Sequence, residues 1–438
     1  MKRESRNYRM LRVLARRHGP GSPVWRRRLA MGAGAVLVGL VALLFAEMAN
    51  WAIAIFKTYV AAIRWLPLLV TPLGVVFIAV ATRKFTPEGR GSGIPQVIAA
   101  TTDPGASLGT LISLRVGCAK LLMTAAGLLA GASVGREGPT VQVSAAIMAR
   151  VHRIFRVPVT AGVIIAGGAA GVAGAFNTPL AGVAFAIEEL ANAFEQRVAL
   201  LVMTAILIAG IVSLGIAGDY LYFGTMPQTL GLGRTLIVAP VAGVLGGLSG
   251  GLFARLVLAI TYNRERYLGP LASRPVAWAL LCGLGIALIG IFTQVTWGTG
   301  YSEAKAAIEG APQSLWFGPG KFVATLLSTV AGLPGGIFSP SLATGAGVGS
   351  LLCLLFPHDP RGAVVLLGMV AYFTGVVRAP LTAVIIIVEA TASRGMILPL
   401  FASALIGDSS ARLVCKDKLY HALAREFLSR SAPDRESA

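Results

Sequence analysis

The sequence predicts an all-α polytopic membrane protein built from two related halves, and three observations support this prediction. Of the 438 residues, 55% are hydrophobic and 13% are charged, and the mean hydropathy of +0.74 is typical of a chain with several membrane spans. The 53 glycines permit close helix packing and broken helices. Residues 120–189 align without a gap on residues 321–390, and 16 of these 70 positions are identical. Such an internal repeat is typical of transporters and channels.

Charge and hydropathy divide the chain into five segments. The N-terminus is basic, with ten Lys or Arg and one Glu in residues 1–28, and the first apolar run, from about 29 to 56, is too long for a signal peptide. A basic flank before a membrane span predicts a cytoplasmic terminus in the cell membrane rather than nucleic-acid binding. The charged C-terminal segment likewise predicts a cytoplasmic C-terminus. The predicted segments are the basic N-terminal segment 1–28, the first membrane repeat 29–217, a linker 218–234, the second membrane repeat 235–415, and the C-terminal segment 416–438.

Several apolar segments are too short to cross a hydrocarbon core of about 30 Å upright. Examples are residues 92–100, 160–175 and 379–388, each bounded by Gly or Pro. We expect half-helices or strongly tilted helices that meet near the membrane midplane. The repeat aligns their breaks, for instance Gly135 with Gly336, but it leaves open whether the two halves are parallel or inverted.

Neither a metal site nor an enzyme is predicted. The four cysteines are scattered without metal-ligand spacing, and the four histidines fall in or beside polar junctions. An intramembrane serine protease using Ser92 or Ser133 would need a base within reach, and Lys120 is the one conceivable base in the apolar region. We therefore expect no metal, no cofactor and no catalytic residue.

A charged break in an apolar region is the strongest functional signal. Residues 134–141 read VGREGPTV, so Arg136 and Glu137 interrupt long runs of Ala, Leu, Val and Gly. A charge at the membrane centre costs about 2.5–3.5 kcal/mol on insertion scales, so such residues usually mark a pathway or a site. The glycines permit a helix break, and Pro139 suits the first turn of the next helix. Free amides at that helix start attract an anion, and a carboxylate there can take the anion's place or accept a proton.

Three further motifs accompany this break. Residues 91–95 (GSGIP) offer an uncharged donor, Ser92, although taken alone they are better explained by a loop turn. Residues 336–340 (GIFSP) are the repeat counterpart of the charged break, with Ile337 and Phe338 in place of the charges. Tyr420 follows in KDKLY near the C-terminus, where an interface aromatic is the plain alternative.

Together the four motifs resemble the CLC family of chloride channels and chloride/proton antiporters, in the order and spacing of that family from about residue 30 to 425. The resemblance implies the CLC fold, in which two inverted-topology halves of tilted and broken helices form a homodimer with one pore per subunit. It also implies that chloride and protons are the transported ions and that membrane lipid surrounds the chain. Paired cytoplasmic nucleotide-binding (CBS) domains are not expected, because only about eighteen residues follow Tyr420.

The resemblance assigns a role to each motif. The hydroxyls of Ser92 and Tyr420 and the backbone N–H groups of Ile337 and Phe338 would hold a central chloride. The amides around Arg136, Glu137 and Gly138 would form an outer anion position. Glu137 would be the gating residue and a proton carrier, and its carboxylate would compete with chloride for this outer position.

Glu189 decides between exchanger and channel. In the CLC antiporters the second acid of this Glu188-Glu189 pair resembles an internal proton-transfer residue, whereas channels usually place an apolar residue there. The repeat counterpart Glu389 indicates that Glu188 is partly architectural.

Some antiporters of the family also carry acids where this chain has Gln96 and Ile98. We therefore hypothesise that Lys120 faces Glu189 directly as electrostatic support, although its counterpart Lys321 favours an ordinary helix-end lysine. A passive chloride channel of the same fold is the main alternative. A fluoride exporter is disfavoured by the intact GSGIP motif and by the proline of GREGP.

Overall fold

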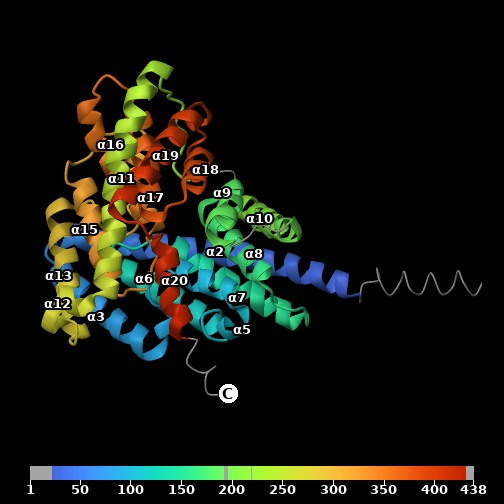
Figure 1. The fold of residues 1–438 in the computed structure, drawn as a ribbon. Coiled ribbons are helices and arrows are strands. Elements are labelled where there is room, and N and C mark those ends of the chain that lie inside the picture. Colours follow the sequence, from blue (N-terminus) through green and yellow to red (C-terminus); the bar gives the residue numbers. More distant parts are fainter. Residues whose placement is uncertain (1–21, 192–195, 219, 431–438) are drawn as a thin grey trace, which may run out of the picture.

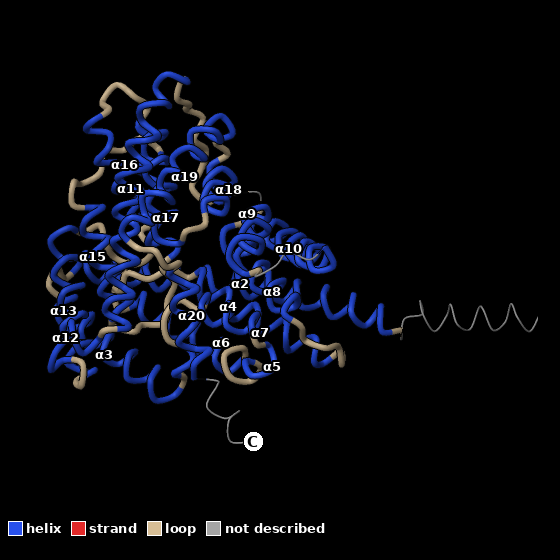
Figure 2. The backbone as a smooth tube through the Cα atoms, in the orientation of Figure 1, coloured by secondary structure: helices blue, strands red, loops and turns tan. Residues whose placement is uncertain are grey.

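The structure is a computed structural model that describes residues 22–191, 196–218 and 220–430 (Figure 1). Within these residues the chain consists of helices and loops, and β-pairing is limited to two isolated bridges (Figure 2). This confirms the predicted all-α class. Most of the basic N-terminal segment and the end of the C-terminal tail lie outside the described residues.

The first half runs from α2 to α10. Its helices are α2 Pro23–Ala62, α3 Pro67–Phe85, η1 Pro87–Gly89, α4 Ile94–Thr102, α5 Pro104–Ser107, α6 Leu114–Leu129, α7 Glu137–Ile154, α8 Ala161–Phe176, α9 Pro179–Phe185, the π-helical turn η2 Ala186–Leu190, and α10 Gln196–Ala217.

The second half begins at Leu232, so the linker is slightly shorter than the predicted 218–234. Its helices are α11 Leu232–Tyr262, α12 Arg264–Leu268, η3 Gly269–Leu271, α13 Pro275–Thr293, α14 Tyr301–Ile308, α15 Phe317–Val330, α16 Phe338–Leu355, α17 Arg361–Val377, α18 Pro380–Thr391, η4 Arg394–Met396, α19 Ile397–Val414 and α20 Leu419–Arg430.

Helix lengths fit a membrane protein with many incomplete or tilted crossings. Seven helices in the described part of the chain are long and apolar enough to span a bilayer. The longest, α2, has 40 residues; at about 1.5 Å per residue it is about 60 Å long, so it tilts strongly or extends beyond the core. By contrast, α4 has 9 residues and α18 has 12, as the short apolar segments predicted.

The two halves repeat the same order of elements and are related by a local twofold axis. Helices α7, α9 and α10 begin 201 residues before α16, α18 and α19. Equivalent helices pack against each other across the boundary: α3 against α13, α9 against α18, and α7 against α16. Gly135 pairs with its counterpart Gly336 in an antiparallel bridge. The antiparallel bridge between equivalent residues agrees with the inverted halves that the family resemblance implies.

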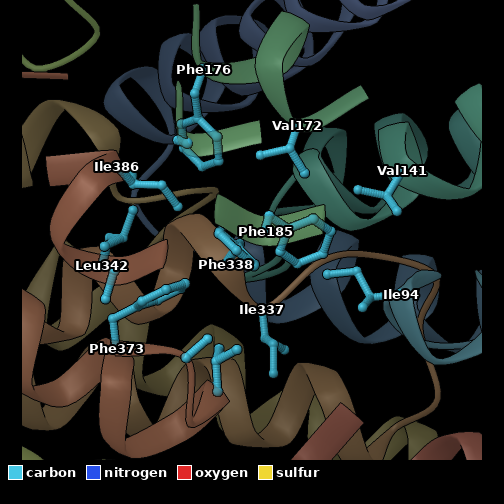
Figure 3. Close-up of a cluster of buried hydrophobic side chains, with 14 of the residues drawn as sticks. Ile94, Val141, Val172, Phe176, Phe185, Ile337, Phe338, Leu342, Phe373 and Ile386 are labelled. Atoms are coloured by element: carbon cyan, nitrogen blue, oxygen red, sulfur yellow. The ribbon is translucent and has the colours of Figure 1, made fainter. Parts of the chain in front are cut away.

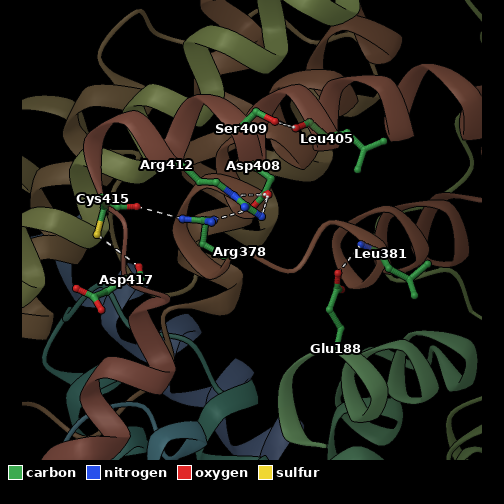
Figure 4. A network of polar contacts seen from close by, with 9 residues as sticks. All are labelled: Glu188, Arg378, Leu381, Leu405, Asp408, Ser409, Arg412, Cys415 and Asp417. Atoms are coloured by element: carbon green, nitrogen blue, oxygen red, sulfur yellow. Dashed lines mark hydrogen bonds and ion pairs between the residues drawn. The ribbon is translucent and has the colours of Figure 1, made fainter. Parts of the chain in front are cut away.

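Two glutamates hold the halves together reciprocally. The carboxylate of Glu188 accepts hydrogen bonds from the N–H groups of Leu381 (3.1 Å) and Thr382 (2.7 Å) at the start of α18. Glu389, its repeat counterpart, accepts from Leu180 (3.1 Å) and Ala181 (2.9 Å) at the start of α9. Each carboxylate therefore caps a helix of the opposite half, and Figure 4 shows Glu188 reaching Leu381.

The C-terminal helix returns to the first half. Helix α20 packs against α4 (Figure 2), and the segment before it is anchored by Arg378, directly after α17. The guanidinium of Arg378 donates to Asp408 (2.5 Å) and to the carbonyl of Cys415 (3.1 Å), as Figure 4 shows. This network fixes the chain five residues before Tyr420.

Candidate functional site

Three helix breaks meet at the centre of the molecule. The N–H groups of Gly135 and Gly336 each donate to the other's carbonyl, at 2.6 and 2.7 Å. Gly335 donates to the carbonyl of Gly91 at 3.1 Å, which joins the GSGIP loop to the other two. The N-termini of α4, α7 and α16 therefore lie together. The first N–H groups of a helix have no partner within it, so this junction concentrates free donors and positive helix-dipole ends.

Gly138 makes this convergence sterically feasible. A Cβ atom at this position would lie 2.5 Å from both the carbonyl oxygen and the Oγ of Ser92, and 3.1 Å from the Cα of Gly336. Any larger residue would push the three loops apart.

Two buried hydroxyls lie beside the junction. Neither the Oγ of Ser92 nor the hydroxyl of Tyr420 forms a geometrically sound hydrogen bond with a described residue, although both atoms are shielded from solvent. These two hydroxyls interact with each other from opposite ends of the chain, so they form one pair of donors at the edge of the junction. Both residues, with Ile337, line a cavity of about 440 Å³. Arg83 and Arg264 line the same cavity and give it a positive mouth that attracts anions.

The ring of Phe338 forms an apolar wall between the two halves. Its centroid lies 4.5 Å from that of Phe373 and 5.9 Å from those of Phe176 and Phe185, and Figure 3 shows this cluster. The side chain is thus fixed by packing, and the N–H group of Phe338 remains at the open start of α16. This position suits a constriction that a dehydrated anion passes.

The carboxylate of Glu137 sits on the N-terminus of the opposite helix. The residue is only 1% exposed. Its Oε2 accepts the N–H of Ser339 at 3.3 Å, and its Oε1 accepts the Ser339 hydroxyl. The side chain folds back to Gly135, where a Cβ atom would be only 2.6 Å from Oε2. An ionised side chain therefore occupies the place that an anion would take at the start of α16.

Arg136 is buried beside this carboxylate but is held mainly by other groups. Its Nε lies 3.9 Å from Oε1 of Glu137. One terminal nitrogen donates to the carbonyl of Ala46 (2.9 Å) and to Asn50 (3.1 Å), and the guanidinium stacks 5.6 Å from the Tyr222 ring. Arg136 thus supplies positive charge near the site while remaining tied to α2 and to the linker loop.

Comparison with known proteins agrees with this geometry. The family model described as "Voltage gated chloride channel" matches residues 74–412. The chain belongs to this family. Two curated relatives of this CLC protein are H(+)/Cl(-) exchange transporters named ClcA. The one from Cronobacter sakazakii is 30% identical, with 92% of this chain and 90% of the relative covered. The one from Klebsiella pneumoniae is 31% identical, with 90% of this chain and 87% of the relative covered.

A solved structure is also similar over nearly the whole CLC chain. The crystal structure of a slow cyanobacterial Cl-/H+ antiporter superposes with a TM-score of 0.79 at 27% identity, and covers 94% of this chain and 99% of its own. The relatives are transporters rather than enzymes. Of the two serines in the protease alternative, Ser133 pairs its hydroxyl with that of Thr325 at 2.9 Å rather than with a base.

Glu189 is buried, but the structure does not place Lys120 against it. The Nζ of Lys120 is buried without a hydrogen-bond partner among the described residues, and no ion pair joins it to a described carboxylate. It lies near Gly93, where a Cβ atom would be 3.1 Å from Nζ. Instead, the Nδ1 of His421 lies 3.3 Å from Oε1 of Glu189. The structure thus shows no direct ion pair between Lys120 and Glu189, and electrostatic support by Lys120 stays a prediction.

Three residues of the site were missed from the sequence. Ser339 is the repeat counterpart of Gly138, so the 201-residue offset contained a signal for it. His421 directly follows Tyr420, and its adjacency to the pore motif was the available signal. Tyr222, which interacts with Arg136 and Ser339, lies in the predicted linker, and no local pattern marked it.

Proposed function

We propose that this protein exchanges chloride for protons across the cell membrane through a pore in each subunit. The observation that carries the proposal is the buried carboxylate of Glu137 on the amide and hydroxyl of Ser339. Ionised, Glu137 replaces an anion at the start of α16. Protonated, it loses its charge and its hold on these donors, swings away and opens the outer path. One side chain thus serves both ions, and no cofactor is involved.

Chloride would bind in two places. In the central position it accepts hydrogen bonds from the hydroxyls of Ser92 and Tyr420 and from the N–H groups of Ile337 and Phe338. In the outer position it takes the amides around Arg136, Glu137 and Gly138 when the carboxylate has left. Uncharged donors hold the anion without trapping it, as conduction requires.

Glu189 would carry the proton on the inner side. Its side chain is fully buried, and the Tyr420 hydroxyl interacts electrostatically with both Glu189 and Glu137. This supports a proton path between the two acids that passes near the proposed central chloride position. The relatives named as exchangers support this assignment over a passive channel.

Positive charge supports the orientation of the chain. Arg26, near the start of α2, donates to the carbonyl of Phe155 after α7, and Arg83 and Arg264 share the cavity mouth with α20. Cytoplasmic loops carry such an excess of arginine, so both termini are assigned to the cytoplasm. We expect a homodimer with two separate pores, surrounded by lipid.

Flux measurements in liposomes test the exchange. With a chloride gradient imposed and external pH recorded, wild type should move protons opposite to chloride, and its reversal potential should respond to a pH gradient. Glu189→Ala should retain chloride flux and lose proton movement. A wild-type reversal potential that ignores pH would identify a passive channel instead.

A further inference from the structure

The carboxylate of Glu189 is enclosed without a hydrogen-bond donor. It lies on the π-helical turn η2, a distortion often found at functional sites. Its side chain is 0% exposed, and neither oxygen forms a good hydrogen bond with any described residue. A buried, unpaired carboxylate is costly, so this group needs either a proton or a cation beside it. The structure offers one candidate within 4 Å in the described chain, the imidazole of His421.

His421 links this enclosed acid to water. It lies in the first turn of α20, and its side chain is 34% exposed, whereas Nδ1 is shielded and faces Oε1 of Glu189 at 3.3 Å. The ring therefore has one nitrogen inside the protein and an exposed remainder. Imidazole takes up and releases protons near neutral pH, and it can accept a proton on one nitrogen and release another from the second.

We propose that His421 is the cytoplasmic proton relay that loads and unloads Glu189. In the inward-to-outward step, the imidazolium gives its Nδ1 proton to Oε1 of the Glu189 carboxylate. The N–H bond breaks and the O–H bond forms, which leaves a neutral ring and a neutral acid. The neutral ring keeps its proton on the exposed Nε2, so it rotates to bring the vacant Nδ1 to cytoplasmic water, takes up a proton there and rotates back. The reverse sequence releases protons to the cytoplasm.

The charged residues nearest to Glu189 and His421 in sequence are paired with other groups. On the same side, Glu188 is already held by the amides of α18 and interacts electrostatically with Lys418. Asp417 lies just before α20, and its Oδ1 is 3.5 Å from a terminal nitrogen of Arg425, which lies in α20 with His421. Asp417 is therefore already paired.

The other elements packed against α20 form no ion pair with Glu189 or His421 in the described chain. Helix α4 has no ionisable side chain between Ile94 and Thr102. Helix α11 contributes the Tyr262 hydroxyl, which donates to the carbonyl of Ala422, and Arg378 after α17 is bound to Asp408. Within the described chain, His421 is thus the basic side chain within 4 Å of Glu189.

The inference rests on the proposed exchange, and its test separates the two. His421→Gln and His421→Asn remove the titratable ring but keep a polar group near Nε2 or Nδ1, so one of them suffices if the other misfolds. The matched control is His358→Gln, in the exposed loop between α16 and α17. Chloride flux and proton flux are measured together in liposomes over a range of pH.

We expect both His421 variants to keep chloride flux within about twofold of wild type and to lose at least about tenfold in proton flux, in line with the loss of a positioned proton carrier. The wild-type dependence of proton flux on cytoplasmic pH should flatten in the variants and persist in His358→Gln. Unchanged proton flux, or an equal fall in both fluxes, would overturn the relay. Absence of proton movement in wild type would instead overturn the proposed exchange.

Discussion

Replacing Ser339 by alanine should release the gate. In the structure the Ser339 hydroxyl and N–H both donate to the Glu137 carboxylate, and the two residues are 4% and 1% exposed. The substitution deletes the hydroxyl donor and leaves the N–H donor in place. Because water has little access, the lost hydrogen bond is not readily replaced.

The expected change in rate depends on how much more strongly the Ser339 hydroxyl binds the Glu137 carboxylate than it binds chloride. A hydrogen bond to a charged group contributes about 1.5–3 kcal/mol. A chloride ion that displaces Glu137 can accept the same hydroxyl, so only the excess of the carboxylate over chloride counts. We therefore use the lower end, about 1.5 kcal/mol, which corresponds to roughly a tenfold increase in the open population.

The assay is the initial rate of chloride efflux per subunit from liposomes, with proton flux recorded in parallel. Ser339→Ala should turn over about tenfold faster when gate departure limits the rate, with an unchanged ratio of the two ions because Glu137 remains. Ser341→Ala is the matched control, since Ser341 is equally buried in α16 and its hydroxyl has no partner among the described residues. A rate that is unchanged, reduced, or raised equally in the control would refute the reasoning.

Three further outcomes follow from the site and its supports. Glu137→Ala should retain chloride flux and abolish proton flux, because the substitution removes the carboxyl group that carries the proton; coupled flux would contradict this. Glu389→Gln should lower the free energy of unfolding by about 1 kcal/mol through a weakened helix cap, seen as a lower thermal midpoint, whereas the exposed Glu309→Gln should not. Gly138→Ala should abolish chloride flux by parting the three loops, while Gly233→Ala, with open space around it, should be neutral.

Much of the site was predictable because its parts are local. Each signal lies within a few residues of sequence. The charge pair in an apolar run pointed to Glu137, the GSGIP motif to Ser92, and the repeated break to the start of α16. The same locality explains why support by Lys120 stays a prediction. The sequence contains Lys120 and Glu189 but does not give the distance between them. In the structure the Lys120 amine lies beside Gly93.

Hydropathy, helix breaks and the repeat alone determined that this chain is a two-half, all-α membrane protein with anion-attracting helix starts. Tertiary structure decided that the breaks before α7 and α16 meet, that Ser339 holds the carboxylate of Glu137, and that His421 faces Glu189. The physical reason is that these contacts join residues about 200 positions apart, whose meeting depends on how α7, α16 and α20 pack. Propensity and composition describe each helix, but they do not contain the geometry between helices.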